Sequence, residues 1–111
     1  MSEEQGRRVG LNEAIFREVN EQIETLNRDL GTDERTMTAV CECADGDCTD
    51  RLQISVSTYE RVRTDPRRFV IVPGHELAEF EPVVESTEGY DIVQKREGAA
   101  AELARETDPR S

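Results

Sequence analysis

The sequence predicts a small α+β domain, in which an N-terminal amphipathic helix packs on a small, mainly antiparallel sheet and a zinc-type site lies at one end. Three observations lead to this prediction. Apolar residues recur at helical spacing through residues 11–30, and several segments between residues 36 and 94 alternate apolar and polar residues as strands do. All three cysteines lie within residues 41–48, ahead of the single histidine, His75.

The size and composition allow one domain with a thin apolar core. The chain has 111 residues, of which 35% are hydrophobic and 5% aromatic, so little apolar surface is available for burial. Small domains of this kind commonly gain stability from a metal, a disulfide or a partner subunit. We predict a flexible arm over residues 1–10, a single metal-stabilised α+β domain over residues 11–96, and a C-terminal helix and tail over residues 97–111.

The charge argues against two classes of partner. With 25 acidic and 14 basic residues, the formal net charge is −11, which disfavours direct binding to nucleic acid or to an anionic membrane because both present negative charge. No window approaches the roughly 18 apolar residues of a membrane-spanning helix, and residues 1–10 do not resemble a signal peptide. The sequence therefore predicts a soluble, cytoplasmic protein whose thiols are reduced.

The N-terminal helix is the clearest element. Its apolar residues fall on one stripe at steps of three and four, with Asn12 placed to cap the start and Gly31 placed to end the helix. The stripe consists of Phe16, Val19, Ile23, Leu26 and Leu30. Two interpretations are open: the stripe covers the domain's own sheet, or it is a contact surface for a second copy of the chain or for another protein.

A hairpin is predicted after this helix. Residues 36–43 are rich in β-formers and run into the cysteine loop, a turn at residues 45–47 reverses the chain, and residues 51–56 alternate as the returning strand. Ser57, followed three residues later by Glu60, has the form of a capping box and predicts a helix of about two turns.

The second half of the chain predicts a further strand, a hairpin and a last helix. The apolar run 69–72 indicates a buried strand, which leads directly into the loop that carries the histidine. Pro82 and the Glu88-Gly89 turn bound a final hairpin. The alanine-rich segment 98–106 predicts a short C-terminal helix.

The cysteines and the histidine predict a metal site. Cys41, Cys43 and Cys48 together with His75 supply the three thiolates and one imidazole of a closed zinc site, because zinc prefers four tetrahedral sulfur and nitrogen donors. The Cys-x-Cys spacing is the less usual form. Residues i and i+2 of a strand lie about 6.6 Å apart, so the backbone must curl for both thiols to reach one ion. Glu76 is an alternative fourth ligand.

The order of these motifs resembles that of a known group of proteins. The spacing Cys41-x-Cys43-x4-Cys48, followed by a Pro-Gly-His-Glu loop at His75, is similar to that of small uncharacterised actinobacterial proteins. The resemblance covers about residues 11–95. It implies nothing about activity, so the functional expectations depend on the residues alone.

These features favour a non-enzymatic, zinc-stabilised regulatory or adaptor domain that acts through protein contacts. The acidic composition, the helix stripe and the lack of a recognisable catalytic constellation in the sequence point in this direction. One alternative is a metal-dependent hydrolase, with Glu76 or Glu42 as the base and a zinc ion held by three cysteines and water. Another is a zinc or thiol sensor, in which oxidation of the closely spaced cysteines releases the ion.

Overall fold

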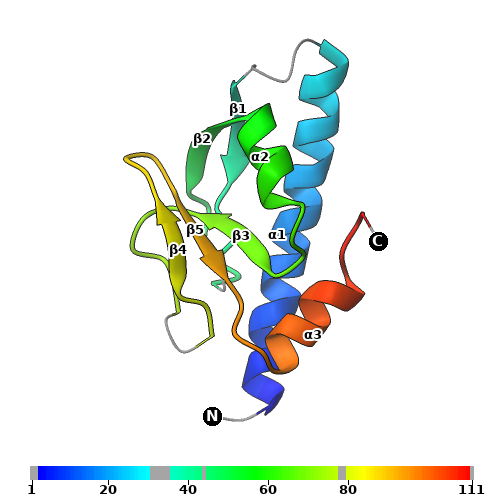
Figure 1. Ribbon diagram of the computed structural model, residues 1–111, viewed down its shortest axis with the longest axis vertical. Helices are drawn as coiled ribbons and strands as arrows, with labels where there is room; N and C mark the ends of the chain where they lie inside the picture. Colours follow the sequence, from blue (N-terminus) through cyan, green and yellow to red (C-terminus); the bar gives the residue numbers. More distant parts are fainter. Residues whose placement is uncertain (1–2, 31–35, 44, 78–79, 111) are drawn as a thin grey trace.

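The described part of the chain comprises residues 3–30, 36–43, 45–77 and 80–110 of a computed structural model, with the side chains of residues 3–7 and 28–30 left out of the description. It confirms the α+β class (Figure 1). In chain order the elements are α1 (Glu3–Leu30), β1 (Thr36–Val40), β2 (Arg51–Ser55), α2 (Val56–Val62), β3 (Arg68–Ile71), β4 (Val83–Ser86), β5 (Asp91–Gln94) and α3 (Ala99–Glu106).

The five strands form two antiparallel sheets rather than one. β1 pairs with β2 as the predicted hairpin, and the other sheet has the order β3-β5-β4. In the second sheet Val93 of β5 pairs with Phe69 on one side and with Val83 on the other. Just beyond β1 the backbone N–H of Glu42 donates to the carbonyl of Val70 at 2.8 Å, and this bond joins the two sheets.

The apolar core lies between the hairpin, α2 and the facing residues of β3 and β5. Alternate residues of both hairpin strands are buried, as their pattern predicts. The helix α2 starts directly after the hairpin, and the Oγ of Ser55 caps it by accepting from the N–H of Thr58 at 3.1 Å, so the cap is Ser55 and not the expected Ser57. The buried core residues are Met37, Ala39, Leu52, Ile54, Val56, Tyr59, Val62, Val70 and Ile92.

The first helix is longer than expected. It begins at Glu3, so residues 3–10 of the predicted arm continue the helix. The predicted cap at Asn12 is therefore an interior position. Gly31, the predicted C-terminal cap, and the side chain of Leu30 lie outside the described part of the chain.

The buried face of α1 is polar, which corrects the expectation that its apolar stripe covers the sheet. The side chains on this face are at most 1% exposed and are Glu13, Arg17, Asn20 and Glu24. Of the predicted stripe, Val19 and Leu26 are exposed, whereas Phe16 and Ile23 are half-buried and Ile23 packs against the core. The helix thus turns its more apolar side outward.

Hydrogen bonds explain why polar residues of α1 lie inside. The amide of Asn20 accepts from the N–H of Val40 and donates to its carbonyl, both at 2.8 Å, which completes the pairing of the backbone at the end of β1. The guanidinium of Arg17 donates to the carbonyl of Ala104 at 2.9 Å and lies 4.9 Å from the ring centroid of Phe69. Buried backbone groups need such partners, and an apolar side chain supplies none.

A second group of buried charges lies near the first turns of α1. Lys95 is 1% exposed, and its ammonium contacts the carboxylates of Glu13 and Glu81, both 0% exposed. The ammonium also lies 5.2 Å from the ring centroid of Phe69. Burial raises the pKa of Glu13 well above its ordinary value, and a hydrogen bond with Glu81 acts in the same direction. We call Lys95, Glu13 and Glu81 the Lys95 cluster.

The C-terminal tail is held against the helices. The guanidinium of Arg110 forms ion pairs with Glu21 and Glu24 of α1, at 3.1 and 2.8 Å, and with Glu60 of α2 at 2.6 Å. The tail therefore joins two helices that are far apart in the sequence. Among the described residues, we find no helix whose length and apolar content suffice to cross a membrane.

Candidate metal centre

Two loops bring the cysteines and the histidine together at one end of the hairpin. The loop between β1 and β2 carries the three thiols, and the loop after β3 carries the imidazole. The ligand atoms of Cys41, Cys43, Cys48 and His75 all lie within 4.8 Å of one another. The structure thus gathers the four residues that the sequence predicts as ligands, and they are placed to bind a metal ion.

Cys41 and Cys43 converge because the strand ends before them. The sequence predicted a strand through Cys43, but β1 ends one residue before Cys41. The N–H of Cys41 donates to the carbonyl of Asp50 at 3.0 Å, whereas that of Glu42 donates to Val70 in the other sheet. Successive residues therefore bond to different segments, and the backbone curls as the Cys-x-Cys spacing requires.

Two separations between donor atoms match those around one tetrahedral ion. The Nδ1 atom of His75 lies 3.5 Å from the Sγ of Cys41 and 3.7 Å from the Sγ of Cys48. Sulfur and nitrogen atoms bound to the same Zn²⁺ at about 2.0 to 2.3 Å stand about 3.5 to 3.8 Å apart. Three sulfurs and one imidazole nitrogen are also the donors that favour zinc over magnesium or calcium. The residues present therefore fit a zinc ion.

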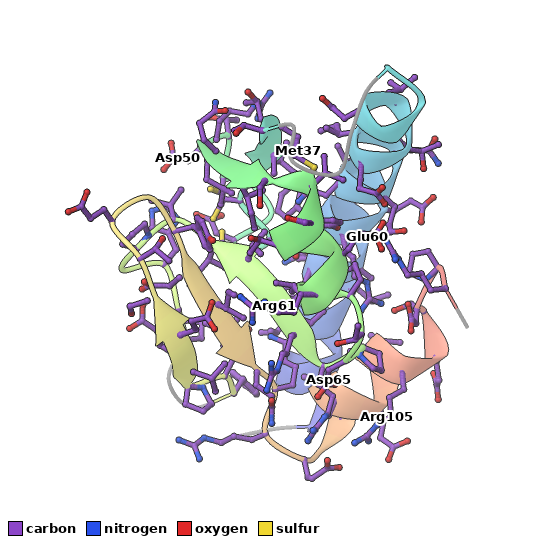
Figure 2. The ribbon with its side chains drawn as sticks, turned by 45° about the horizontal axis from the view of Figure 1, so that its top comes forward. Met37, Asp50, Glu60, Arg61, Asp65 and Arg105 are labelled. Atoms are coloured by element: carbon purple, nitrogen blue, oxygen red, sulfur yellow. The ribbon has the colours of Figure 1, made fainter. Side chains whose placement is uncertain are left out.

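Neighbouring groups orient these donors. The backbone N–H of Val72 donates to the Sγ of Cys41 at 3.2 Å. On the far side of the imidazole, the Nε2 of His75 lies 3.4 Å from the Oδ2 of Asp50, which Figure 2 shows beside sulfur atoms at this end of the molecule. A carboxylate at Nε2 favours the tautomer with its proton there, which leaves the Nδ1 lone pair for an ion.

The three thiols differ in their acidity. A hydrogen bond from Cys41 lowers the pKa of Cys43 to about 5. That same hydrogen bond, together with burial, raises the pKa of Cys41, and burial raises the pKa of Cys48. A divalent cation would provide the positive charge that the other two thiols need in order to ionise.

Glu42 anchors the peptide between the two neighbouring cysteines. Its side chain is 0% exposed, and its oxygens accept four hydrogen bonds, so the loop is tied to α1, to the end of α2 and to β3. The donors are Asn20 Nδ2 at 2.7 Å, Tyr59 Oη at 3.1 Å, Val70 N at 3.0 Å and Arg63 Nη2 at 3.4 Å. These four hydrogen bonds hold the curled backbone in place.

Glu42 and Asp50 hold the metal ligands in position. The sequence did not predict this supporting role for either residue. The polar residues of α1 at steps of four, three and four were a signal for the Glu42 network, because such spacing marks a second face of the helix. For Asp50 the sequence gives no comparable signal. Its position next to the imidazole depends on how the hairpin loop meets the loop after β3.

The two glutamates considered as catalytic bases have different surroundings. Glu42 is buried with both carboxylate oxygens hydrogen-bonded, so it has no access to a substrate or to water. Glu76 is half-buried, and in the described part of the chain its Oε1 has no hydrogen-bond partner. Among the described residues, the cluster of ligand atoms includes His75 and not Glu76.

We compared the chain with protein-family models, with curated proteins and with solved structures. None of the three comparisons gives a match. The functional argument therefore depends on the geometry and the chemistry of this site.

Proposed function

We propose that this protein is a non-enzymatic regulatory or adaptor domain that is stabilised by a structural zinc ion and acts through contacts with proteins. The observation that carries the proposal is the gathering of four ligand atoms, from Cys41, Cys43, Cys48 and His75, within 4.8 Å. Four protein donors fill the tetrahedral coordination of zinc, which is typical of structural sites, whereas catalytic sites keep one position open for water.

A bound zinc ion would join two loops that follow strands of different sheets. Three donors belong to the hairpin loop at residues 41–48, and the fourth, His75, belongs to the loop after β3. Structural zinc contributes an apparent binding free energy of about 10 kcal/mol, which is also folding free energy when the site exists only in the folded chain. In a chain with 35% hydrophobic residues, this contribution is comparable to the whole stability of a small domain.

The surface supports a role in protein contacts. Leu11 and Ile15 of α1 are 48% and 62% exposed, although the same helix buries four polar side chains. Exposed apolar residues that gather on one face are typical of protein interaction sites. The net charge of −11 disfavours nucleic acid as the partner.

A zinc or thiol sensor is a second candidate, and one observation favours it. The three thiols lie within one cluster of ligand atoms, and Cys48 is half-buried, so oxidation could join two of them in a disulfide. In this case the same four residues would hold the ion, and oxidation would release it. The two candidates differ in how readily the ion leaves.

The test is to measure zinc content and thermal stability in Cys41→Ser, Cys48→Ser and His75→Ala. We expect the unchanged protein to purify with one zinc per chain and each variant to lose zinc and stability together, because four donors share one ion. Asp47→Asn is the matched control, since Asp47 is an exposed acid of the same loop and should leave both quantities unchanged. Full stability in the absence of any metal would contradict the proposal.

Mild oxidation separates the structural role from the sensor role. A structural site should retain its zinc when the folded protein is treated with a small excess of hydrogen peroxide. A sensor should release the ion at stoichiometric oxidant and bind it again after reduction. Zinc release followed by a chromogenic chelator distinguishes these results.

A further inference from the structure

The C-terminal tail places one guanidinium among three carboxylates. The Nε of Arg110 lies 3.1 Å from both carboxylate oxygens of Glu21. Its Nη1 and Nη2 donate to the two oxygens of Glu60 at 2.6 and 3.3 Å, and Nη2 also donates to Glu24 at 2.8 Å. Every nitrogen of this guanidinium therefore has a carboxylate partner. We call Glu21, Glu24 and Glu60 the arginine site.

Two helices hold the arginine site together. Glu21 and Glu24 lie three residues apart in α1 and so share one face of it. Glu60 belongs to α2, which three buried side chains fix in the apolar core. The side chain of Glu24 is only 2% exposed, and carboxylates at such close range repel one another unless a cation lies between them. The core thus keeps the three carboxylates in place, and their charge favours a cation.

The tail that fills this site is held by polar contacts near the surface. None of residues 107–110 is buried, and Figure 1 shows them turning back from α3 along the side of α1. The Oγ1 of Thr107 accepts from Arg17 at 3.1 Å. Asp108 accepts from the backbone N–H of Arg110 at 3.0 Å. Exposed ion pairs contribute little each and are screened by salt, and segments without buried side chains open most readily. The tail can therefore leave the site while the domain stays folded.

We propose that the arginine site binds an arginine side chain of a partner protein, and that Arg110 occupies the site until such a partner replaces it. This inference rests on the proposed role in protein contacts, for which it names the chemistry of one partner. It does not depend on the zinc ion.

The arrangement of the oxygens selects arginine over lysine. A planar guanidinium can direct two N–H groups at the two oxygens of one carboxylate, as Arg110 does with Glu60, whereas an ammonium is a single point charge. The formal charge of −11 also attracts basic segments from a distance. A basic segment that carries an exposed arginine is therefore the partner that fits this site.

The tail competes with any such partner because it belongs to the same chain. A ligand on a short flexible tether has an effective concentration on the order of millimolar at its site. An external arginine binds only when it exceeds this internal competitor. Removal of the charge at Arg110 should therefore raise the apparent affinity of the site for an arginine on another molecule.

A peptide with the sequence of residues 107–111 is the probe, because it carries the arginine that fits the site. NMR titration of the backbone amides of α1 and α2 in the full chain measures its binding. We expect Arg110→Gln to bind the peptide at least about tenfold more tightly than the unchanged chain does, because the tethered competitor has lost its charge. The matched control is Arg105→Gln, which removes an exposed arginine paired with Glu97 and should show no gain.

Two further measurements define the site. In Arg110→Gln, a peptide with lysine in place of its arginine should bind at least about tenfold more weakly, because an ammonium cannot match the fixed directions of a guanidinium. Adding Glu60→Gln to Arg110→Gln should abolish the gain, since Glu60 faces both Nη atoms.

Three results would overturn the proposal. The first is a peptide that binds Arg110→Gln no better than the unchanged chain. The second is an equal gain in Arg105→Gln, or equal binding of the lysine peptide, because either would show a general effect of charge. The third is a mass of two chains in sedimentation equilibrium that falls to one in Arg110→Gln, which would place the tail in the arginine site of a second copy.

The zinc content of every variant is measured in the same samples. A chain that lacks zinc and binds the peptide as expected would contradict the proposed metal centre and leave the arginine site intact. A chain that holds zinc but shows no gain in Arg110→Gln would contradict the arginine site alone.

Discussion

The metal centre and the Lys95 cluster both connect segments that are far apart in the sequence, but they differ in the source of their cation. In the Lys95 cluster the ammonium of Lys95 lies between the carboxylates of Glu13 and Glu81, so the positive charge belongs to the chain itself. In the metal centre, three thiols and one imidazole face one another and are placed to bind a cation from solution. The first connection needs no added ion, whereas the second would depend on the metal supply.

The two sites also differ in exposure. The side chains of Lys95, Glu13 and Glu81 are all fully buried, whereas that of His75 is 31% exposed and that of its neighbour Asp50 is 57% exposed. The metal centre is therefore partly open to solvent on the side of its imidazole, although Cys41 and Cys43 are buried. The composition of the solution can therefore affect the metal centre more readily than the buried Lys95 cluster.

Removal of the metal should have the largest effect. Structural zinc contributes about 10 kcal/mol, and small domains have a total stability of about 5 to 15 kcal/mol, so a strong chelator should unfold the chain or leave it marginally stable. Urea unfolding followed by circular dichroism, with and without chelator, measures this change. Added zinc should restore the original curve. If the two curves coincide, the metal centre does not hold the fold together.

Replacement of Lys95 by Met should have the next largest effect. The change leaves two buried carboxyl groups without their cation, which typically costs about 3 to 5 kcal/mol. Arg61→Met is the control, because the ion pair of Arg61 with Glu85 is exposed and its loss should matter much less. Equal destabilisation by the two substitutions in urea would show that Lys95 contributes no more than a surface charge.

The effect of Lys95→Met should also depend on pH. Burial raises the pKa of Glu13, so its contribution to stability is greatest below the ordinary pKa of a glutamate, about 4.3, and is lost as the pH rises toward the folded-state pKa. The positive charge of Lys95 lowers the pKa of Glu13 and so limits this loss of stability. Without Lys95, the destabilisation should be smaller at about pH 6 than at about pH 8. A difference that stays constant over this range would contradict the assignment.

A smaller effect is expected from Glu42→Gln, which alters the support of the metal centre and none of its donors. The amide would turn an N–H₂ group toward donors that now reach a carboxylate, which costs about 1 to 3 kcal/mol. Zinc affinity should fall about 10- to 100-fold, as is typical when a supporting contact is lost. Competition with a fluorescent zinc chelator measures the affinity, with Asp47→Asn as the control. A loss of stability at unchanged affinity would show that Glu42 does not shape the site.

Most of the fold could be predicted from the sequence because the signals are local. The alternation in residues 36–40 and 51–55 and the alanine-rich segment before Glu106 determine a hairpin and a helix with few alternatives. The four donors could be predicted because three cysteines and a single histidine are a typical donor set of a structural zinc site. The separation into two sheets was missed because it depends on Asn20, which pairs with the backbone of Val40 where the strand ends.

The sequence left open which face of α1 is buried, for a different reason. The polar residues from Glu13 to Glu24 recur at the same steps as the apolar residues from Phe16 to Leu26, so periodicity alone does not decide which face is buried. The partners of the polar face, such as the backbone of Ala104 and the side chain of Arg110, lie more than eighty residues away in the sequence. Only the tertiary structure reveals these contacts.

X-ray absorption at the zinc edge, on the protein as purified, tests the central claim most directly. If the three thiols and the imidazole of His75 bind one ion, the spectrum should fit three sulfur atoms at about 2.3 Å and one nitrogen at about 2.0 Å. In whatever zinc His75→Ala still holds after reloading, the imidazole signal should be absent while the sulfur shell remains. A protein that purifies without metal, or a zinc ion surrounded by oxygen and nitrogen with no sulfur shell, would contradict the account.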